Sequence, residues 1–421
     1  MFDISIIYRV ANAVRLFAVR GVKAVLINSR TPLLRNPHTY QAVIPMLVFF
    51  TFSVMAHAAA THYVSLYGTN DTAGGYPNWV GAATNIELAV SAATAGDTVL
   101  VSNGTYYLTN EIAISTAITM TSVNGRGVTI VNGNNYPGKP VTNRCINIIV
   151  NSTNTVVDGF TILNGNATYA AGINFNAGTV RNSSIISNQS RSSGGVGGAG
   201  IYASSAKAII YNCTIAYNVA SNATANSSGG GIYSQGIISN CIISANQAWK
   251  GGGTAGQGGG VYLNGGIIYN SLIVGNYAST YGGGVDVGAV INCTIVSNCA
   301  QYGGGIYAAS CLNSIVYFNT APNGSNYYNV VMTNCCTAPT NDLNAGSINN
   351  IQSNPQFVSE DAGDWRLSKG SPCINAGTNE SWMTGAVDLD LDGHRRIDRF
   401  SGIVDMGCYE YLPQGFMFSV P

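Results

Sequence analysis

One short phrase recurs along the middle of this chain and restricts its fold more than any other feature. The phrase is an asparagine, two residues, an Ile or Val, two more residues and a second asparagine. Its copies start 30, 28, 30, 22 and 21 residues apart, at Asn182, Asn212, Asn240, Asn270, Asn292 and Asn313. A period of this length indicates a small structural unit that stacks on copies of itself.

The composition of each copy favours β-strands. The segments are short, rich in β-branched residues and bounded by Gly and Asn, which is typical of strands and tight turns. A unit of about 21 residues cannot bury its own apolar face, so the copies must stack as a parallel coil. We expect about seven coils with a spacing of about 4.8 Å.

Alignment of the copies turns each position into a column along the coil axis. One column is expected to be buried, and it contains Ile185, Ile215, Ile243, Ile273, Ile295 and Val316. The asparagines are expected at corners, where they tolerate left-handed backbone and bond to it. A glycine precedes Ile or Val once per copy, at Gly172, Gly200, Gly231, Gly260, Gly284 and Gly305. We attribute it to a corner whose backbone angles are closed to other residues.

These phrases resemble the repeats of a known group. Copies that read GGGIY and then NCTI are similar to repeats of right-handed parallel β-helix proteins of the pectin-lyase-like superfamily, and of chlamydial-type polymorphic outer membrane proteins. The resemblance covers about residues 60–411. It implies an all-β fold, a solenoid with a short N-terminal capping helix and a small C-terminal β-rich segment. It also implies that hydrolases of this fold use clustered Asp residues, and that lyases use calcium beside an Arg or Lys base.

The first residues differ from the repeats. Residues 43–56 form an apolar run that is too short for a membrane span of about 20 residues and suits a signal-peptide core. Ala56 and Ala58 form an A-x-A cleavage pattern. We expect the mature chain to begin near Ala59 and to be secreted or held at the bacterial cell surface; a retained membrane anchor is the alternative.

We expect four parts: residues 1–58, a signal peptide with an extended n-region; 59–135, the N-terminal cap and first coils; 136–341, the parallel β-helix repeats; and 342–421, an Asp-rich C-terminal segment. In the cap, Thr84 lies three residues before Glu87, a capping-box spacing. One face of the following helix would carry Ile86, Ala89, Val90 and Ala93. This helix is expected to cover the apolar core at the open end of the solenoid.

Charged residues are scarce, at 9% of the chain against about 25% in a typical domain. Removal of residues 1–58 takes away six of 18 basic residues and one of 18 acidic residues, which leaves 12 against 17. The mature chain is therefore acidic and has no basic stripe that could neutralise phosphates. We expect no nucleic-acid partner and no transmembrane span in the mature chain, and the oligomeric state stays open.

Ten cysteines occur in a chain expected to enter an oxidising compartment. Cys213, Cys241 and Cys293 share one column with serines, so this column takes small residues and we expect free, buried thiols there. Cys373 and Cys408 either bridge the tail or are small core residues. No Cys and His spacing suggests a zinc site.

The C-terminal segment contains the most specific motif. The phrase VDLDLDGHRRIDRFSGIVDMGCYEY resembles the ending of the bacterial choice-of-anchor Q group, in which a β-helix ends in an Asp-Gly-Arg turn and an Asp-x-Gly-x-Tyr-Glu phrase. The matching residues here are Asp392, Gly393, Arg395 or Arg396, Asp405, Gly407, Tyr409 and Glu410.

Three aspartates of this segment have the spacing of a calcium loop. Asp388, Asp390 and Asp392 stand at positions 1, 3 and 5, with glycine at position 6. Position 12 is Arg399, where an EF-hand needs Glu, so an EF-hand is excluded. Two interpretations remain, a looser Ca²⁺ turn or an Asp-rich turn held by Arg395 and Arg396.

Catalytic groups are sparse in the coils. Residues 159–330 contain one acidic residue, Asp286, and no Glu or His. This segment therefore lacks a carboxylate pair for acid–base catalysis and has too few ligands for a calcium cluster. We expect a noncatalytic secreted or surface protein that acts by adhesion or glycan contact. The alternatives are a polysaccharide lyase or glycoside hydrolase using Asp286 with Lys207 or Lys250, and a purely structural envelope component.

The residue after the Ile or Val of the glycine phrase forms the candidate ligand site. Strand alternation turns it outward when its neighbour points inward. The column contains Tyr202, Tyr233, Tyr262, Asp286 and Tyr307. Flat rings with hydroxyl tips suit sugar rings, and a carboxylate can orient sugar hydroxyls. The expected ligand is a polysaccharide or cell-surface glycan; alternatively, the stacked tyrosines only stabilise the sheet.

Overall fold

The computed structural model describes residues 58–134, 143–192, 197–222, 226–251, 255–384, 389–397 and 401–412. The signal-peptide prediction for residues 1–58 lies outside this range except for its last residue. Within the described residues, no helix is both long enough and apolar enough to cross a membrane.

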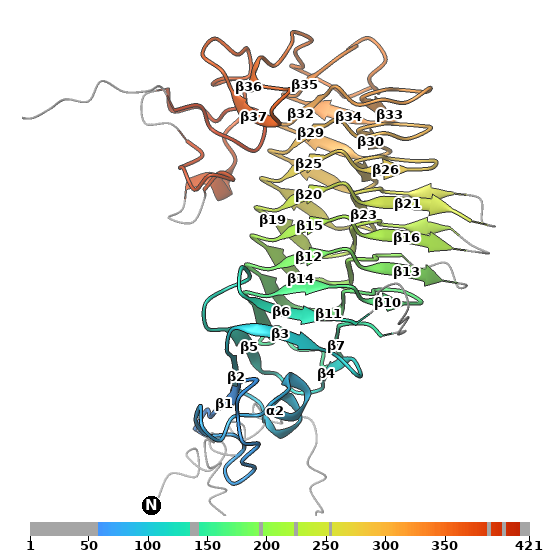
Figure 1. The fold of residues 1–421 in the computed structure, drawn as a ribbon. Helices are drawn as coiled ribbons and strands as arrows, with labels where there is room; N and C mark the ends of the chain where they lie inside the picture. Colours follow the sequence, from blue (N-terminus) through green and yellow to red (C-terminus); the bar gives the residue numbers. More distant parts are fainter. Residues whose placement is uncertain are drawn as a thin grey trace, which may run out of the picture. The chain divides into compact units, whose positions relative to one another are not determined.

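The chain forms the right-handed parallel β-helix that the repeats predict, with coils stacked along one axis (Figure 1). A complete coil contributes one strand to each of three parallel sheets. The first sheet contains β4 (Ile112–Ile114), β7 (Ile146–Ile148), β11 (Ile173–Arg181), β14 (Ile201–Tyr211), β18 (Ile232–Ser234), β23 (Val261–Leu263), β27 (Val285–Asp286), β30 (Ile306–Tyr307) and β33 (Tyr327–Tyr328).

The long strands β11 and β14 bend and continue into the second sheet, and they join the first and second sheets into one 18-stranded sheet. Its other strands are β1 (Thr61–Val64), β2 (Thr98–Val101), β5 (Thr119–Ser122), β8 (Val156–Asp158), β19 (Ile237–Ser239), β24 (Ile267–Tyr269), β28 (Ala289–Ile291), β31 (Ser310–Leu312) and β34 (Val331–Thr333).

The third sheet has ten strands in the described chain. They are β3 (Gly104–Tyr107), β6 (Thr129–Asn132), β9 (Thr161–Leu163), β12 (Ser184–Ile186), β15 (Thr214–Ala216), β20 (Ile242–Ser244), β25 (Leu272–Val274), β29 (Thr294–Val296), β32 (Ile315–Tyr317) and β35 (Cys336–Thr337). The expectation of about seven coils was too low, because β3, β6 and β9 precede the first copy of the asparagine phrase.

A lateral extension projects from the middle coils (Figure 1). Its outgoing strands are β10 (Asn166–Ala167), β13 (Gln189–Ser192), β16 (Val219–Asn222), β21 (Gln247–Lys250) and β26 (Tyr277–Ala278). Its return strands are β17 (Ser227–Ser228) and β22 (Gly256–Gln257). The extension lies between the third sheet and the first, where the repeat is several residues longer.

The apolar columns fill the interior. The six residues of the predicted Ile and Val column pair in register along the third sheet and are fully buried. Each such side chain stabilises the fold by roughly 1.5–3 kcal/mol relative to an exposed one.

The two asparagines of each copy have different structural roles. The first has a left-handed φ of 44–51° in the copies from Asn182 to Asn313. The second is buried, and each donates its backbone N–H and its Nδ2 to the Oδ1 of the next, at 2.9–3.0 Å from Asn218 to Asn246. The expected corner position holds for both. The sequence pattern did not predict the hydrogen bonds between the side-chain amides of successive coils.

The repeated glycine before Ile or Val is required for a different reason than expected. Gly200 and Gly231 do not have a positive φ. A Cβ on Gly231 would instead lie 2.7 Å from the Gly260 carbonyl oxygen and 2.9 Å from the Asn246 amide nitrogen. The left-handed residue is the glycine two positions earlier, such as Gly229 with φ 74°. Close packing between coils therefore excludes a side chain at the repeated position.

A short helix, α2 (Ile86–Ala92), packs against β1, β2 and β4 at the N-terminal end. The predicted apolar face is buried. The N-cap residue is Asn85, whose side chain accepts the Leu88 amide at 2.9 Å, whereas the Thr84 hydroxyl bonds to Asn70. The capping-box assignment to Thr84 was therefore wrong by one residue.

The C-terminal segment folds back along the solenoid. It contains an antiparallel hairpin of β36 (Phe357–Ser359) and β37 (Asp364–Leu367), then the 3₁₀ turn η2 (Ser381–Thr384). Its apolar side chains cover the outer face of the third sheet at Leu272, Val296, Ile315 and Cys336.

Hydrogen bonds also connect the C-terminal segment to the side of the solenoid. The side chains of four first asparagines, and of Asn334 at the same position of the next coil, bond to C-terminal residues; the four are Asn240, Asn270, Asn292 and Asn313.

All ten cysteines are free thiols. The prediction for Cys213, Cys241 and Cys293 is confirmed, since all three are buried and unbridged. Cys373 and Cys408 are also unbridged and buried, so the small-residue interpretation holds for them. Burial raises the pKa of the Cys408 thiol to about 12.

Candidate functional site

The structure brings the predicted candidate residues into one column on the outer face of the first sheet. Tyr202 pairs in register with Tyr233, then with Tyr262, Asp286 and Tyr307. The column continues to Tyr328 on β33, which the sequence pattern did not include because its coil lacks the GGG phrase.

The tyrosine rings stack on one another. The centroid distance is 4.7 Å between Tyr202 and Tyr233, with an interplanar angle of 27°. It is 5.4 Å between Tyr233 and Tyr262, at 18°. Most ring faces are therefore covered by neighbouring rings. A ligand along the column meets ring edges and hydroxyls, and a free face is offered only where a stack ends.

A second pair of tyrosines lies across the glycine turn from this column. Tyr281 and Tyr302 precede the glycine triplets, and their rings lie 5.6 Å apart. Each reaches the column residue one coil further on: Tyr281 contacts Tyr307 at 4.6 Å and Tyr302 contacts Tyr328 at 5.6 Å. Their shared position directly before a glycine triplet is the sequence signal that could have identified both tyrosines.

Asp286 interrupts the column and is buried, with 1% of its surface exposed. Neither carboxylate oxygen has a hydrogen-bond partner among the described residues. Burial raises the pKa of Asp286 to about 7, although the Val287 backbone and the Gln257 side chain oppose the rise. The pKa of Tyr262 is raised by burial and by the nearby Asp286 carboxylate.

A pocket of about 570 Å³ lies at the C-terminal end of the column. Tyr328 stacks on Tyr307 with one face, at 5.7 Å and 5°. β33 is the last strand of the first sheet in the described chain, so no further tyrosine covers the other face. Tyr328 is 42% exposed.

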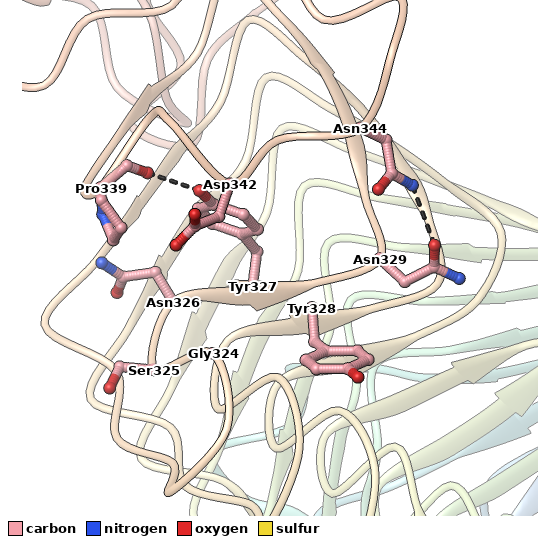
Figure 2. Close-up of a pocket in the computed structure, with 9 residues that line it drawn as sticks. All are labelled: Gly324, Ser325, Asn326, Tyr327, Tyr328, Asn329, Pro339, Asp342 and Asn344. Atoms are coloured by element: carbon pink, nitrogen blue, oxygen red, sulfur yellow. Dashed lines mark hydrogen bonds between the residues drawn. The ribbon is translucent and has the colours of Figure 1, made fainter.

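Polar groups line this pocket, and Figure 2 shows that Asp342, Asn326 and Pro339 lie around Tyr327, whose ring points to the opposite side of β33 from that of Tyr328. Asn344 donates its side-chain amide to Asn329 at 2.9 Å, and the Tyr327 hydroxyl donates to the Pro339 carbonyl at 2.6 Å. Asp342 adds a carboxylate to the pocket wall. We name this site the end pocket. An aromatic face beside amide and carboxylate groups is suited to a sugar ring with its hydroxyls.

Two of the three aspartates of the predicted calcium turn, Asp390 and Asp392, lie in the described chain and are bonded to other protein groups. Asp390 is buried, and its oxygens accept the amides of Asp392, His394 and Glu410 at 2.7–3.0 Å. Asp392 forms a bidentate pair with Arg366 at 2.6 and 2.8 Å. Asp388 lies outside the described residues. Within the described ranges, no group of three His, Cys, Asp or Glu residues could hold a metal.

Arginines hold this segment together, and one of them, Arg396, is among the two that the sequence indicated. The partner of Asp392 is Arg366, which also contacts Asp364. Arg396 is buried and pairs with Glu410 at 3.1 Å. Burial raises the pKa of Glu410 to about 8, although Arg396 opposes the rise. The Asp-x-Gly-x-Tyr-Glu residues thus form internal contacts.

In the described chain, neither of the lysines considered as catalytic partners contacts Asp286. Its oxygens have no partner in the described chain, so neither Lys207 nor Lys250 contacts them. Asp158 pairs instead with Arg181 at 2.8 Å.

Comparison with known proteins supports the fold. No family model and no curated protein matches the chain. Among solved structures, the pectate lyase Pel9A is similar over 84% of this chain and 98% of its own length, with 17% identity and a TM-score of 0.51. The pectin methylesterase PemA from Erwinia chrysanthemi is similar over 70% of this chain and 82% of its own, with 11% identity and a TM-score of 0.32. The likeness to the pectate lyase supports the right-handed parallel β-helix fold of this chain.

Proposed function

We propose that this protein is a secreted or cell-surface β-helix protein that binds glycans without cleaving them. The contact surface would be the tyrosine column of Tyr202, Tyr233, Tyr262, Asp286 and Tyr307, together with the end pocket.

The observation that carries the proposal is the end pocket. Tyr328, which is 42% exposed and stacks on Tyr307, lines this pocket together with the amides of Asn329 and Asn344 and the carboxylate of Asp342. This combination stacks on one face of a sugar and bonds to its hydroxyls. The remainder of the column would extend the contact along a chain of sugars with ring edges and hydroxyls.

The surroundings of Asp286 support a noncatalytic role. General acid–base cleavage of a glycosidic bond uses two carboxyl groups that both reach the substrate. Asp286 is covered by its neighbours and has no carboxylate partner in the described coils. Calcium is not included in the proposal, because Asp390 and Asp392 already bond to backbone amides and to Arg366.

The test is binding of the mature chain to a glycan array, followed by titration of the glycan that binds most tightly. We expect Tyr328→Ala to weaken binding at least tenfold, because the stacking face is lost. Tyr211→Ala is the matched control, since Tyr211 on the second sheet is 40% exposed. Equal affinity of the Tyr328→Ala and Tyr211→Ala variants would contradict the end pocket as the binding site.

A second assay separates binding from cleavage. The protein is incubated with uronate polysaccharides and calcium, and unsaturated products are followed by ultraviolet absorbance. We expect no sustained product. Product formation that disappears in Asp286→Asn would instead establish a lyase.

A further inference from the structure

The lateral extension carries a second aromatic surface, separate from the tyrosine column. Trp249 on β21 is 42% exposed. Its indole Nε1 donates to the Gln247 side chain at 2.8 Å, and the Tyr277 ring lies 4.6 Å away. Two contacts therefore fix the orientation of an exposed indole, which lowers the entropy lost when a ligand stacks on it.

The outer face of the extension differs from the face that meets the return strands. Ala220, Ala248 and Ala278 are buried in one column between the strand layers. Trp249 alternates with Ala248 along β21 and so points to the opposite side. This places it away from the tyrosines of the first sheet.

Space beside the indole is left open by a small residue. Trp249 pairs in register with Ser221, and Ser221 pairs with Arg191. Trp249 and Arg191 are therefore two coils apart, about 9.6 Å at the usual strand spacing. Between them stands only the short Ser221 side chain, whose hydroxyl bonds to the Ser190 carbonyl at 3.3 Å. A saccharide ring a few ångströms thick fits in this space.

Arg191 supplies an uncompensated positive charge. Its guanidinium donates to the Gln189 side chain at 2.9 Å. The coils from 159 to 330 contain only one acid, Asp286, which is buried on the first sheet. Because no carboxylate neutralises it within these coils, the exposed guanidinium is available to a carboxylate or sulfate on a ligand.

We propose that Trp249, Gln247 and Arg191 form a second saccharide-binding site that takes a sugar ring bearing a carboxylate or sulfate group. The ring stacks on the indole above Ser221, the anionic group pairs with Arg191, and the Gln247 amide bonds to a hydroxyl. Binding at this site does not require the end pocket. Its expected ligands are restricted to saccharides that carry a carboxylate or sulfate group.

The experiment is affinity electrophoresis of the mature chain in gels that contain alginate, dextran sulfate or neutral dextran. The carboxylate and sulfate polymers distinguish the two sources of negative charge, and dextran is the uncharged match of dextran sulfate. We expect at least one anionic polymer to bind tenfold more tightly than dextran. Trp249→Ala should weaken that binding about tenfold and Trp249→Phe less, because a smaller aromatic ring remains.

Arg191→Gln separates the charge from the stacking. It should abolish the preference for the anionic polymer over dextran, and added salt should have the same effect on the unmodified protein. Tyr328→Ala should leave the anionic binding unchanged, so failure of this site and failure of the end pocket give different results. The proposal is overturned if the wild type is not retarded by either anionic polymer, or if Trp249→Ala and Arg191→Gln both bind within twofold of wild type.

Discussion

At the scale of single residues, Asp286 is the least compatible with its surroundings. A carboxylate at a position taken by tyrosine in neighbouring coils has lost water, and no described group forms a hydrogen bond of good geometry with it, although the Val287 backbone and the Gln257 side chain are near enough to lower its pKa. Ionisation of such a group is costly, and the raised pKa of about 7 expresses this cost. The residue therefore couples the stability of the column to pH.

The sign of this coupling can be tested with Asp286→Asn. Between about pH 4 and pH 7 the folded state keeps a proton that the unfolded state releases, so the wild type becomes less stable as the pH rises through this range. The asparagine variant lacks this dependence. We expect similar free energies of unfolding near pH 4 and an advantage of the variant on the order of 4 kcal/mol above pH 7. Urea unfolding at several pH values measures the difference, and a difference that does not change with pH would contradict the argument.

At the scale of the element, the coil is defined by positions that face the next coil. The repeated glycine leaves room for the asparagine amide and the carbonyl of the neighbouring coil. The buried asparagine donates both its backbone N–H and its side-chain amide to the Oδ1 of the asparagine in the next coil. A substitution at either position therefore affects the packing of the adjacent coil as well as that of its own coil.

Gly231→Ala tests this packing. The added methyl group would lie 2.7 Å from the Gly260 oxygen, so we expect a loss of about 1–3 kcal/mol in the free energy of unfolding. Gly127→Ala is the control, because its Cβ would meet no atom within 4 Å. Chemical denaturation of both variants provides the measurement, and equal stability of the two would refute the packing argument.

The repeated columns could be predicted from sequence because each member has the same environment. The buried Ile column, the outward tyrosines and the glycine positions all follow from a constant register. The end pocket could not be predicted, because Pro339, Asp342 and Asn344 lie beyond the last repeat. The partners of Asp392 and Glu410 were missed for a related reason: Arg366 and Arg396 reach them through a segment with no periodicity. The proposed saccharide sites remain predictions.

At the scale of the whole described fold, two segments outside the repeats cover apolar surfaces of the solenoid. The helix α2 covers the first coils, whereas the C-terminal segment lies along the side of the later coils and buries the outer face of the third sheet. Terminal units with a polar outer surface are needed for the solubility of stacked repeats.

Removal of residues 352–421 should expose Leu272, Val296, Ile315 and Cys336 to solvent. We expect the truncated chain to bind a hydrophobic dye, to aggregate and to melt at least 10 °C lower, since several buried apolar side chains lose their cover. Thermal melting and dye fluorescence give the readout. A truncated chain with the wild-type midpoint and no dye binding would show that the segment is not needed for stability.

The ties from Asn240, Asn270, Asn292, Asn313 and Asn334 to the C-terminal segment also have a consequence for how such chains can change in length. A segment that bonds to five successive coils must match the axial spacing of those coils. If a coil were duplicated or deleted between Asn240 and Asn334, every tie beyond that point would move by one coil spacing, about 4.8 Å, and would miss its partner. The number of coils in this part of the molecule is therefore set by the segment that follows them.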